Sequence, residues 1–488
     1  MSTVTLLIAV EESSLGAVEN TLQSLVHQTH QDWEVVFLLD IKDQFLQDPL
    51  EGVIKKIGVE DECDLLFHHN SSSLQAINLQ LESFGDWVGF LTAGDCLHSS
   101  ALENLLEGVD PEAVIAYCDN EHVSRWGYIS YHNNKPPVNP YRLLFQNYLA
   151  DPMLIDGEWL KAHRFDERAT DDPTHDVVLR VLEQRGTKGF HHYRGRCLQK
   201  FRDSFRVEED PRKLPYVSPY DLHAIKMALH RRGIEGVVQQ AYGVVDIQYI
   251  NKMTPSIQVV CFVDDVIDFG KAVIKSLIED KIYPDMLVRV VYRGEDETVA
   301  AFYKKTCSDA SIHFEWTNEA EPAILNRITR TTNQKAVLVL KAIPLGQDWL
   351  RELGHLLTLG FGAVTGRFIK LNRLTFPGTP GWKYEGAHWN HRGSFGELTT
   401  PYQVSVMGPE AFLYDVHEWH RIGVFEESLP IYYVADWTMR ANRDGVKTPV
   451  HTGVSFITNA PVASEDELRV LKGMWADWED PYELHRFV

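Results

Sequence analysis

Short apolar runs alternate with amphipathic stretches from the first residues of the chain. Residues 3–10, 33–40 and 87–91 are apolar almost throughout, which is typical of strands that a sheet buries on both faces. Between the first two runs, residues 15–26 place apolar side chains three and four positions apart, the period of an amphipathic helix. Strands and helices that alternate through short connections predict an α/β fold with a parallel, doubly wound sheet.

The apolar run 87–91 ends in a small polar turn that carries one acid, Asp95. Residues 99–109 then offer a serine N-cap and helical apolar spacing. In parallel α/β sheets, ligands bind just outside the carboxyl ends of the strands. The turn 92–95 is therefore the first candidate site.

The same order of elements begins again in the second half of the chain. Strands are predicted within 256–265 and 286–296, and a late segment, 435–445, echoes 176–186. This repetition predicts an internal duplication into two similar domains. We expect a first domain over 1–215, a helical connector over 216–253, a second domain over 254–460 and a packed tail over 461–488.

Composition and charge narrow the class of protein. The 488-residue chain has a formal charge of −22 and a pI near 5.4, so it lacks the basic excess that binds nucleic acids and anionic membranes. Its six cysteines are scattered, without the paired spacing of a zinc site. No apolar run reaches the roughly 18 residues that a transmembrane helix needs. We expect a cytoplasmic globular protein without a nucleic-acid partner, and peripheral attachment to a membrane stays open.

Several segments, taken in order, resemble a known family. Residues 5–40 and 85–105 look like the opening strand–helix–strand and the metal turn of family 2 glycosyltransferases of the GT-A fold. Further matching segments resemble tandem-domain bacterial surface-polysaccharide transferases of the rhamnosyltransferase type: YCDNEH, KPPVNPYRLLFQNYL, FDERATDDPTHDVVLRVLE, CLQKFRDS, GAVTGRFIKL and GVFEESLPIYYVADWTMR. The resemblance implies two tandem GT-A domains. It also implies sugar transfer from a nucleotide-diphospho-sugar to a glycan or protein acceptor in surface polysaccharide assembly.

The resemblance also implies a set of site residues, from which the first domain departs. In the family an Asp-x-Asp turn holds Mg²⁺ or Mn²⁺, but residues 92–95 here read Thr-Ala-Gly-Asp. The family's His-x-Arg reads Lys-Phe-Arg at 200–202, and an ammonium can neutralise phosphate where a divalent ion is missing. We therefore expect no Mg²⁺ or Mn²⁺ and no other cofactor. The implied nucleotide-sugar ligands are Asp40, Thr92, Asp95, Lys200 and Arg202.

The general base that the family places near the start of a later helix is ambiguous in this chain. The paired acids of the family fall on Thr174 and Asp176, with Asp171 and Asp172 just upstream. The catalytic candidates are thus Asp176 and Asp172. A second interpretation is that Asp176 caps its helix or pairs locally with Arg180, and the spacing favours that structural role.

The second domain departs further from the family. Its nucleobase position falls near Tyr292-Arg293, its metal turn begins with Lys341, and its base position is Val434, two residues before Asp436. A lysine in place of the first metal carboxylate inverts the charge, so we expect no metal-dependent transfer there.

Two functions stay open from the sequence. In the first, the chain is an active glycosyltransferase whose first domain carries any activity. In the second, it is a catalytically silent relative that acts as a scaffold, structural subunit or glycan-binding partner, with a protein partner or a second copy of the chain. Parallel loss of metal and base acids in both domains motivates the second.

Overall fold

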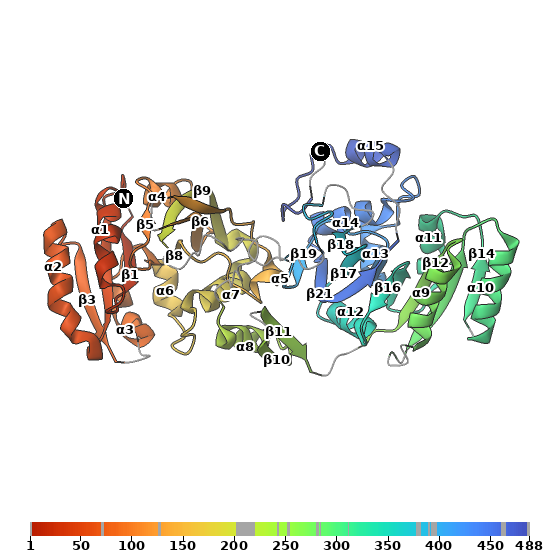
Figure 1. Ribbon diagram of the computed structural model, residues 1–488, viewed down its shortest axis with the longest axis horizontal. Helices are drawn as coiled ribbons and strands as arrows, with labels where there is room; N and C mark the ends of the chain where they lie inside the picture. The colour runs from red at the N-terminus through yellow and green to blue at the C-terminus, as the bar shows by residue number, and fades with distance from the viewer. Residues whose placement is uncertain are drawn as a thin grey trace. The chain divides into compact units, whose positions relative to one another are not determined.

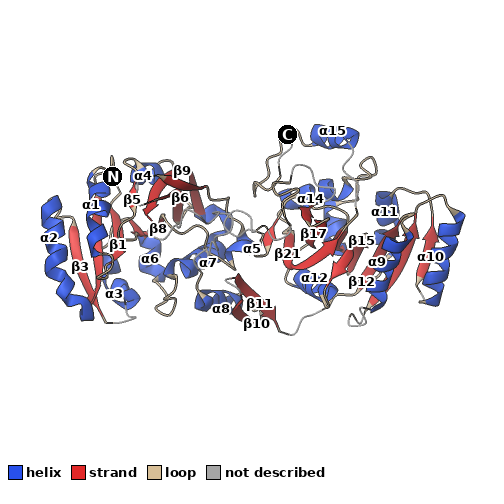
Figure 2. Cartoon of the chain, in the orientation of Figure 1, coloured by secondary structure: helices blue, strands red, loops and turns tan. Residues whose placement is uncertain are grey.

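A computed structural model describes residues 2–69, 73–124, 128–201, 220–241, 244–250, 254–279, 283, 285–310, 312–376, 382–388, 391, 398–459 and 465–485. The chain divides into two compact units, Met1–Gln248 and Tyr249–Val488. Each unit is an α/β structure in which helices flank a central sheet (Figures 1 and 2). The predicted fold class, two tandem α/β domains, is therefore confirmed.

The sheet of the first unit has the strand order β3-β2-β1-β4-β8-β6-β9-β5, with β7 paired to the edge of β6. The strands β3, β2, β1 and β4 run parallel, whereas β8 is antiparallel to both β4 and β6. Their bounds are β1 (Val4–Ala9), β2 (Trp33–Asp40), β3 (Cys63–His68), β4 (Trp87–Phe90), β5 (Cys96–Leu97), β6 (Ile115–Val123), β7 (Ile129–Asn133), β8 (Met153–Asp156) and β9 (Phe190–Phe201).

Helices cover this sheet because each presents an apolar stripe to it. Helices α1 and α2 contribute Leu22, Leu25 and Leu50 to the same buried cluster as Val35 and Phe37 of β2. The helices of the unit are α1 (Val18–Val26), α2 (Gln47–Ile57), α3 (Ser73–Gln80), α4 (Ala101–Leu106), α5 (Pro140–Leu143), α6 (Gly157–His163), α7 (Pro173–Arg185) and α8 (Leu222–Arg231).

The expected connector, 216–253, is helical only in part. Its described residues form α8 and a two-stranded hairpin, β10 (Gly236–Ala241) and β11 (Val244–Tyr249). Helix α8 packs on α7, so it is part of the first unit. The finer boundaries that we expected at 215, 253 and 460 stay predictions.

The second unit repeats the topology of the first. Its strand order is β14-β13-β12-β15-β20-β17-β21-β16, with β18 paired to β17 and β19 to β21. The strands are β12 (Ile257–Val263), β13 (Met286–Tyr292), β14 (His313–Trp316), β15 (Ala336–Leu340), β16 (Ile343–Leu345), β17 (Ala363–Lys370), β18 (Arg373–Thr375), β19 (Tyr402–Gln403), β20 (Ala411–Asp415) and β21 (Pro449–Ile457). The helices are α9 (Ile267–Glu279), α10 (Glu297–Asp309), α11 (Glu321–Thr331), α12 (Trp349–Thr358), α13 (Val416–Ile422), α14 (Tyr433–Arg443) and α15 (Glu465–Met474).

Each sheet is mixed, and the wholly parallel sheet that we predicted is wrong in this respect. The reversed strand inside each sheet is β8 in the first unit and β20 in the second. The outer strands β5, β7, β16, β18 and β19 are also antiparallel to their partners. The chain enters β8 at the end of the sheet where β4 finishes, so β8 must run opposite to β4. Apolar patterning did not reveal this, because a strand buried on both faces has the same composition in either direction.

The duplication extends to buried side chains. Asn78 of α3 donates through Nδ2 to the carbonyl of Phe165 and accepts from its N–H, both at 3.0 Å. Asn326 of α11 brackets Phe425 in the same way, at 3.0 and 2.9 Å. Each asparagine thus ties a helix to the loop that follows α6 or α13.

We predict that Asn326→Leu lowers the free energy of unfolding by about 3 kcal/mol, because it leaves the buried N–H and C=O of Phe425 without this partner. The urea transition of the second unit reports the loss. Asn78→Leu gives a similar loss in the first unit, and the exposed Asn318→Leu serves as the control, with a change under about 0.5 kcal/mol. Identical urea transitions for Asn326→Leu and wild type would contradict a stabilising role for the two hydrogen bonds between Asn326 and Phe425.

Candidate functional site

The acidic turn after β4 is built tightly against α1. The N–H of Gly94 donates to Oγ1 of Thr21 at 2.8 Å, and the N–H of Asp95 donates to the carbonyl of Thr92 at 3.0 Å. Gly94 has φ +99°, and a Cβ there would lie 3.0 Å from Cβ of Ala17, so glycine is required at this turn. The turn buries the Asp95 carboxylate to 4% exposure, while Thr92 stays exposed.

A lysine ammonium from the strand beside this turn faces the carboxylate, because Cys96 of β5 pairs with Gln199 of β9. Lys200, near the end of β9, places Nζ 3.9 Å from Oδ2 of Asp95 and pairs directly with the carboxylate of Asp151. Asp151 immediately precedes Pro152 and β8. Predicted site residues Asp95 and Lys200 therefore share one cluster, and Asp151 joins it.

The backbone that carries Asp151 is held by a buried lysine. Nζ of Lys135 donates to the carbonyls of Leu149, Ala150 and Asp151 at 2.7, 2.7 and 3.0 Å. Lys135 is only 4% exposed, and burial lowers the pKa of its ammonium to about 8. The lysine of the KPPVNP segment thus positions the acid that pairs with Lys200.

A cavity of about 230 Å³ opens beside Asp151. Asp171, Asp172 and Thr174 line it from the loop before α7 and the first turn of that helix. Asp172 is the N-cap: Oδ1 accepts from the Thr174 N–H at 3.1 Å and from its hydroxyl at 2.6 Å, and Oδ2 accepts from Asn147 at 2.9 Å. Burial raises the pKa of the Asp172 carboxyl, although the hydrogen bonds from Thr174 and Asn147 oppose the shift.

His175 fixes the start of α7 as a neutral imidazole. Its Nδ1 accepts the N–H of Asp221 at 3.0 Å, so the proton is on Nε2, which donates to the carbonyl of Leu143 at 2.7 Å. Burial lowers the pKa of the imidazole, which agrees with the neutral form. The cavity wall that bears Asp172 is therefore anchored from two directions.

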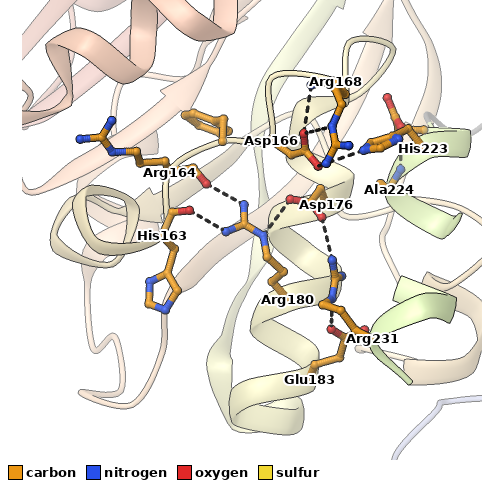
Figure 3. Close-up of polar contacts among 12 residues, drawn as sticks. His163, Arg164, Asp166, Arg168, Asp176, Arg180, Glu183, His223, Ala224 and Arg231 are labelled. Carbon is orange, nitrogen blue, oxygen red and sulfur yellow. Dashed lines mark hydrogen bonds and ion pairs between the residues drawn. The ribbon is translucent and has the colours of Figure 1, made fainter. Parts of the chain in front are cut away.

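Asp176, the other catalytic candidate, lies in a buried ion-pair network (Figure 3). Its Oδ2 is 2.7 Å from Nε of Arg180, and its Oδ1 is 3.4 Å from Nη1 of Arg231 in α8. Arg180 also donates to the carbonyls of His163 and Arg164, at the end of α6. Asp176 does not line the cavity, and both its oxygens face arginines, as the structural interpretation of its spacing predicts.

The second unit contains the same network. Asp436 is 3.0 Å from Nε of Arg440, which donates to the carbonyls of Ile422 and Val424 at the end of α13. The other oxygen of Asp436 accepts the indole N–H of Trp475 at 3.0 Å, where the first unit uses Arg231. Because the network recurs in both units, it is part of the framework.

The predicted ligand Asp40 lies outside the cluster. Asp40 ends β2, on the other side of β1 from the acidic turn. Its carboxylate accepts the N–H of Lys42 at 3.1 Å and lies 3.3 Å from the Lys42 ammonium, so it caps the short helix that follows. Arg202 falls outside the described residues.

Strand registers identify the equivalent positions in the second unit. Lys341 follows β15 as Thr92 follows β4, and Glu410 precedes β20 as Asp151 precedes β8. Nζ of Lys341 lies 3.4 Å from Glu410 and 3.0 Å from Glu321. Burial opposes protonation of Lys341, yet these two carboxylates raise its pKa above the ordinary value. Both units therefore pair a lysine with the acid that precedes the reversed strand.

The described residues do not fit the family's divalent metal. Lys200 occupies the neighbourhood of Asp95, the one acid left in the turn, and Lys341 replaces the first acid in the second unit. Among the described side chains, no group of three or more His, Cys, Asp or Glu converges to hold a metal ion. A cation adjacent to the carboxylate opposes the binding of a second cation by charge repulsion.

Sequence reasoning missed Asp151, the positioning role of Lys135, and the partners of Lys341. The KPPVNP segment was a usable signal, because a lysine before two prolines has a fixed backbone course. Glu321 and Glu410 lie 20 residues before and 69 residues after Lys341, and no local pattern links them.

Comparisons with known proteins add partial likenesses. No protein-family model and no curated protein matches the sequence. The solved structures with a partial likeness include a mannosyltransferase from Pyrobaculum calidifontis in complex with GDP-Man and Mn²⁺, which is 16% identical over 45% of this chain and 61% of that one, at a TM-score of 0.33. Residues 1–349 of S. aureus TarS in complex with UDP are 12% identical over 51% of this chain and 97% of that one, at 0.33. GalNAc-T7 with UDP, GalNAc and Mn²⁺ is 11% identical over 51% of its length and 49% of this chain, at 0.37.

No helix among the described residues combines the length and the apolar character required to cross a bilayer.

We predict that the difference in the free energy of unfolding between wild type and Lys135→Met changes with pH. Between pH 8 and about 10.5 the unfolded chain holds a proton on Lys135 that the folded chain has released, so the wild-type free energy of unfolding rises with pH relative to the variant. Below pH 8 the difference is constant. Urea unfolding across pH 7–10 measures it.

The exposed Lys188→Met provides the control for this series, with no such trend expected. A difference between wild type and Lys135→Met that is flat from pH 7 to 10 would contradict the lowered pKa of Lys135.

Proposed function

We propose that the protein is a glycosyltransferase-like protein whose first domain binds a nucleotide-diphospho-sugar and transfers the sugar to a glycan or protein acceptor. The supporting observation is that charged side chains from separate segments of the first unit lie close together. Lys200 reaches both Asp95 and Asp151, and Asp151 lines the same cavity as Asp172. A fixed cation and a buried carboxylate thus meet beside the carboxyl end of β4, where α/β sheets bind ligands.

The reaction needs a base for the acceptor hydroxyl. The acceptor oxygen forms a bond to the anomeric carbon, the bond from that carbon to the diphosphate oxygen breaks, and the hydroxyl proton moves to a carboxylate. Asp172 suits this role better than Asp176, because it lines the cavity and burial raises its pKa toward the working pH. Asp176 is committed to Arg180 and Arg231.

The diphosphate needs a positive charge as it leaves. Lys200 supplies one at a fixed position, because Asp95 and Asp151 hold its ammonium in place. The same carboxylates oppose the approach of an anion, so we expect weaker diphosphate binding than a divalent ion would give.

A specific observation favours the silent alternative. The Asp172 carboxylate accepts three hydrogen bonds in its capping role, from Thr174 twice and from Asn147 once. A carboxylate with these hydrogen bonds can serve only to stabilise the start of α7. In that case the cavity holds a glycan or a partner without transfer. The surface-polysaccharide role, family membership and cytoplasmic location belong to the proposal as well.

Calorimetric titration with UDP, GDP and dTDP, each in Mn²⁺ and in EDTA, tests the nucleotide site. We predict that one of them binds in EDTA and that Lys200→Met weakens it at least tenfold through loss of the phosphate contact. Lys188→Met is the control, since its ammonium is on the surface beside Glu112. Absence of binding by all three nucleotides in both buffers overturns the proposal.

Asp172→Asn separates catalysis from capping. Asparagine is an equally good N-cap for Thr174, so the helix start is kept, although the contact with Asn147 is lost at a cost of about 1–2 kcal/mol; the amide cannot accept the acceptor's proton. We predict a loss of at least about a hundredfold in kcat for sugar transfer, with unchanged nucleotide affinity. Full transfer activity in Asp172→Asn would assign the residue to the helix cap alone.

A further inference from the structure

The second unit holds a larger cavity than the one beside Asp151. Its volume is about 530 Å³, within the roughly 300–1,000 Å³ of small-molecule sites. It opens where β12 and β15 end, with Phe262 and Lys341 on its wall. The sequence predicts no metal-dependent transfer in this unit, and the proposed function of the first domain does not involve this cavity.

The polar wall of the cavity is a connected network. Glu321 lies 3.0 Å from Lys341 and 3.2 Å from Arg293, and it accepts the hydroxyl of Tyr433 at 3.2 Å. Glu410 lies 3.4 Å from Lys341 and accepts the hydroxyl of Thr458 at 2.9 Å. Each charged group is held by a neighbour, so donors and acceptors are fixed before a ligand arrives.

The charge of this wall argues against an anionic ligand. Four carboxyl side chains line the cavity and two cations accompany them: Asp264, Asp265, Glu321 and Glu410 against Arg293 and Lys341. Both cations already face Glu321. A nucleoside diphosphate would therefore meet excess negative charge.

The remaining wall is apolar. Phe269 and Val273 of α9 contribute one part, and Pro430 and Ile431 another. The second part is pinned by the tail, because the N–H of Ile431 donates to Glu467 of α15 at 2.8 Å. A ligand that fits has hydroxyl groups on one side, for the carboxylates and cations, and C–H groups on the other.

We propose that this cavity binds one neutral or amino-sugar residue of a glycan chain and does not bind a nucleotide. Sugar hydroxyls both donate and accept, so they match a wall where carboxylates and cations alternate, and the C–H face of a pyranose matches Phe269 and Ile431. Whether the first domain transfers sugar has no bearing on this site, which would hold the glycan itself.

An array of neutral and amino-sugar oligosaccharides, probed with the full-length protein, identifies a bound oligosaccharide, whose affinity calorimetry then measures. Asn459→Trp places a bulky ring on the exposed rim of the cavity, and Glu321→Gln removes one acceptor charge with little change in shape. We expect each to weaken oligosaccharide binding at least tenfold. Val266→Ala, on an exposed side chain that does not line the cavity, leaves it unchanged.

UDP serves as the anionic probe in the same titrations. Asn459→Trp is expected to leave any UDP binding as it is in wild type, while Lys200→Met reduces it. Two outcomes overturn the inference: no oligosaccharide on the array binds, or binding survives both Asn459→Trp and Glu321→Gln. Loss of UDP binding in Asn459→Trp would instead make the cavity a nucleotide site. If UDP binds to neither domain, the proposed nucleotide site of the first domain is contradicted and the inference about the oligosaccharide site is unaffected.

Discussion

A lysine ammonium held between carboxylates, where the central strand of each sheet ends, is the interaction on which both candidate sites depend. In the first unit Lys200 comes from β9, and in the second Lys341 comes from the turn after β15. The residue in the second unit that corresponds to Lys200 is Thr458, which donates its hydroxyl to Glu410. The lysine thus comes from a different position in each unit but pairs with the equivalent acid, which is Asp151 in the first unit and Glu410 in the second. A site that loses its positive charge leaves a buried carboxylate uncompensated, which is costly.

The framework around these sites is far more alike in the two units than the sites are. The asparagine brackets on Phe165 and Phe425 and the arginine networks on Asp176 and Asp436 recur with nearly the same distances. The partner of the second aspartate oxygen also comes from a late segment in each unit, since α8 supplies Arg231 and the residue after α15 is Trp475. Buried polar networks tolerate little change, because each unpaired group carries a desolvation cost. Surface cavities tolerate more, so the two units can diverge in ligand while they share a fold.

The sequence was sufficient for several of the parallel strands and for the duplication. The apolar runs 33–40 and 87–91 coincide with β2 and β4, because strands buried on both faces must be apolar throughout. It was insufficient for the direction of β8, which depends on where the chain enters the sheet. It was also insufficient for the partners of Lys200 and Lys341, because Asp151, Glu321 and Glu410 come close only through tertiary folding. The resemblance to glycosyltransferases indicated which stretches to inspect, but the charges in them had to be read from the structure.

The central claim is that a lysine ammonium, and not a divalent ion, provides the positive charge beside Asp95. The most direct test is a crystal structure of the full chain with UDP and Mn²⁺, with diffraction recorded at the manganese absorption edge. The account predicts diphosphate oxygens within hydrogen-bond distance of Nζ of Lys200 and no manganese peak at Asp95. A manganese ion that is coordinated by Asp95 and the diphosphate, with Lys200 displaced, would contradict it.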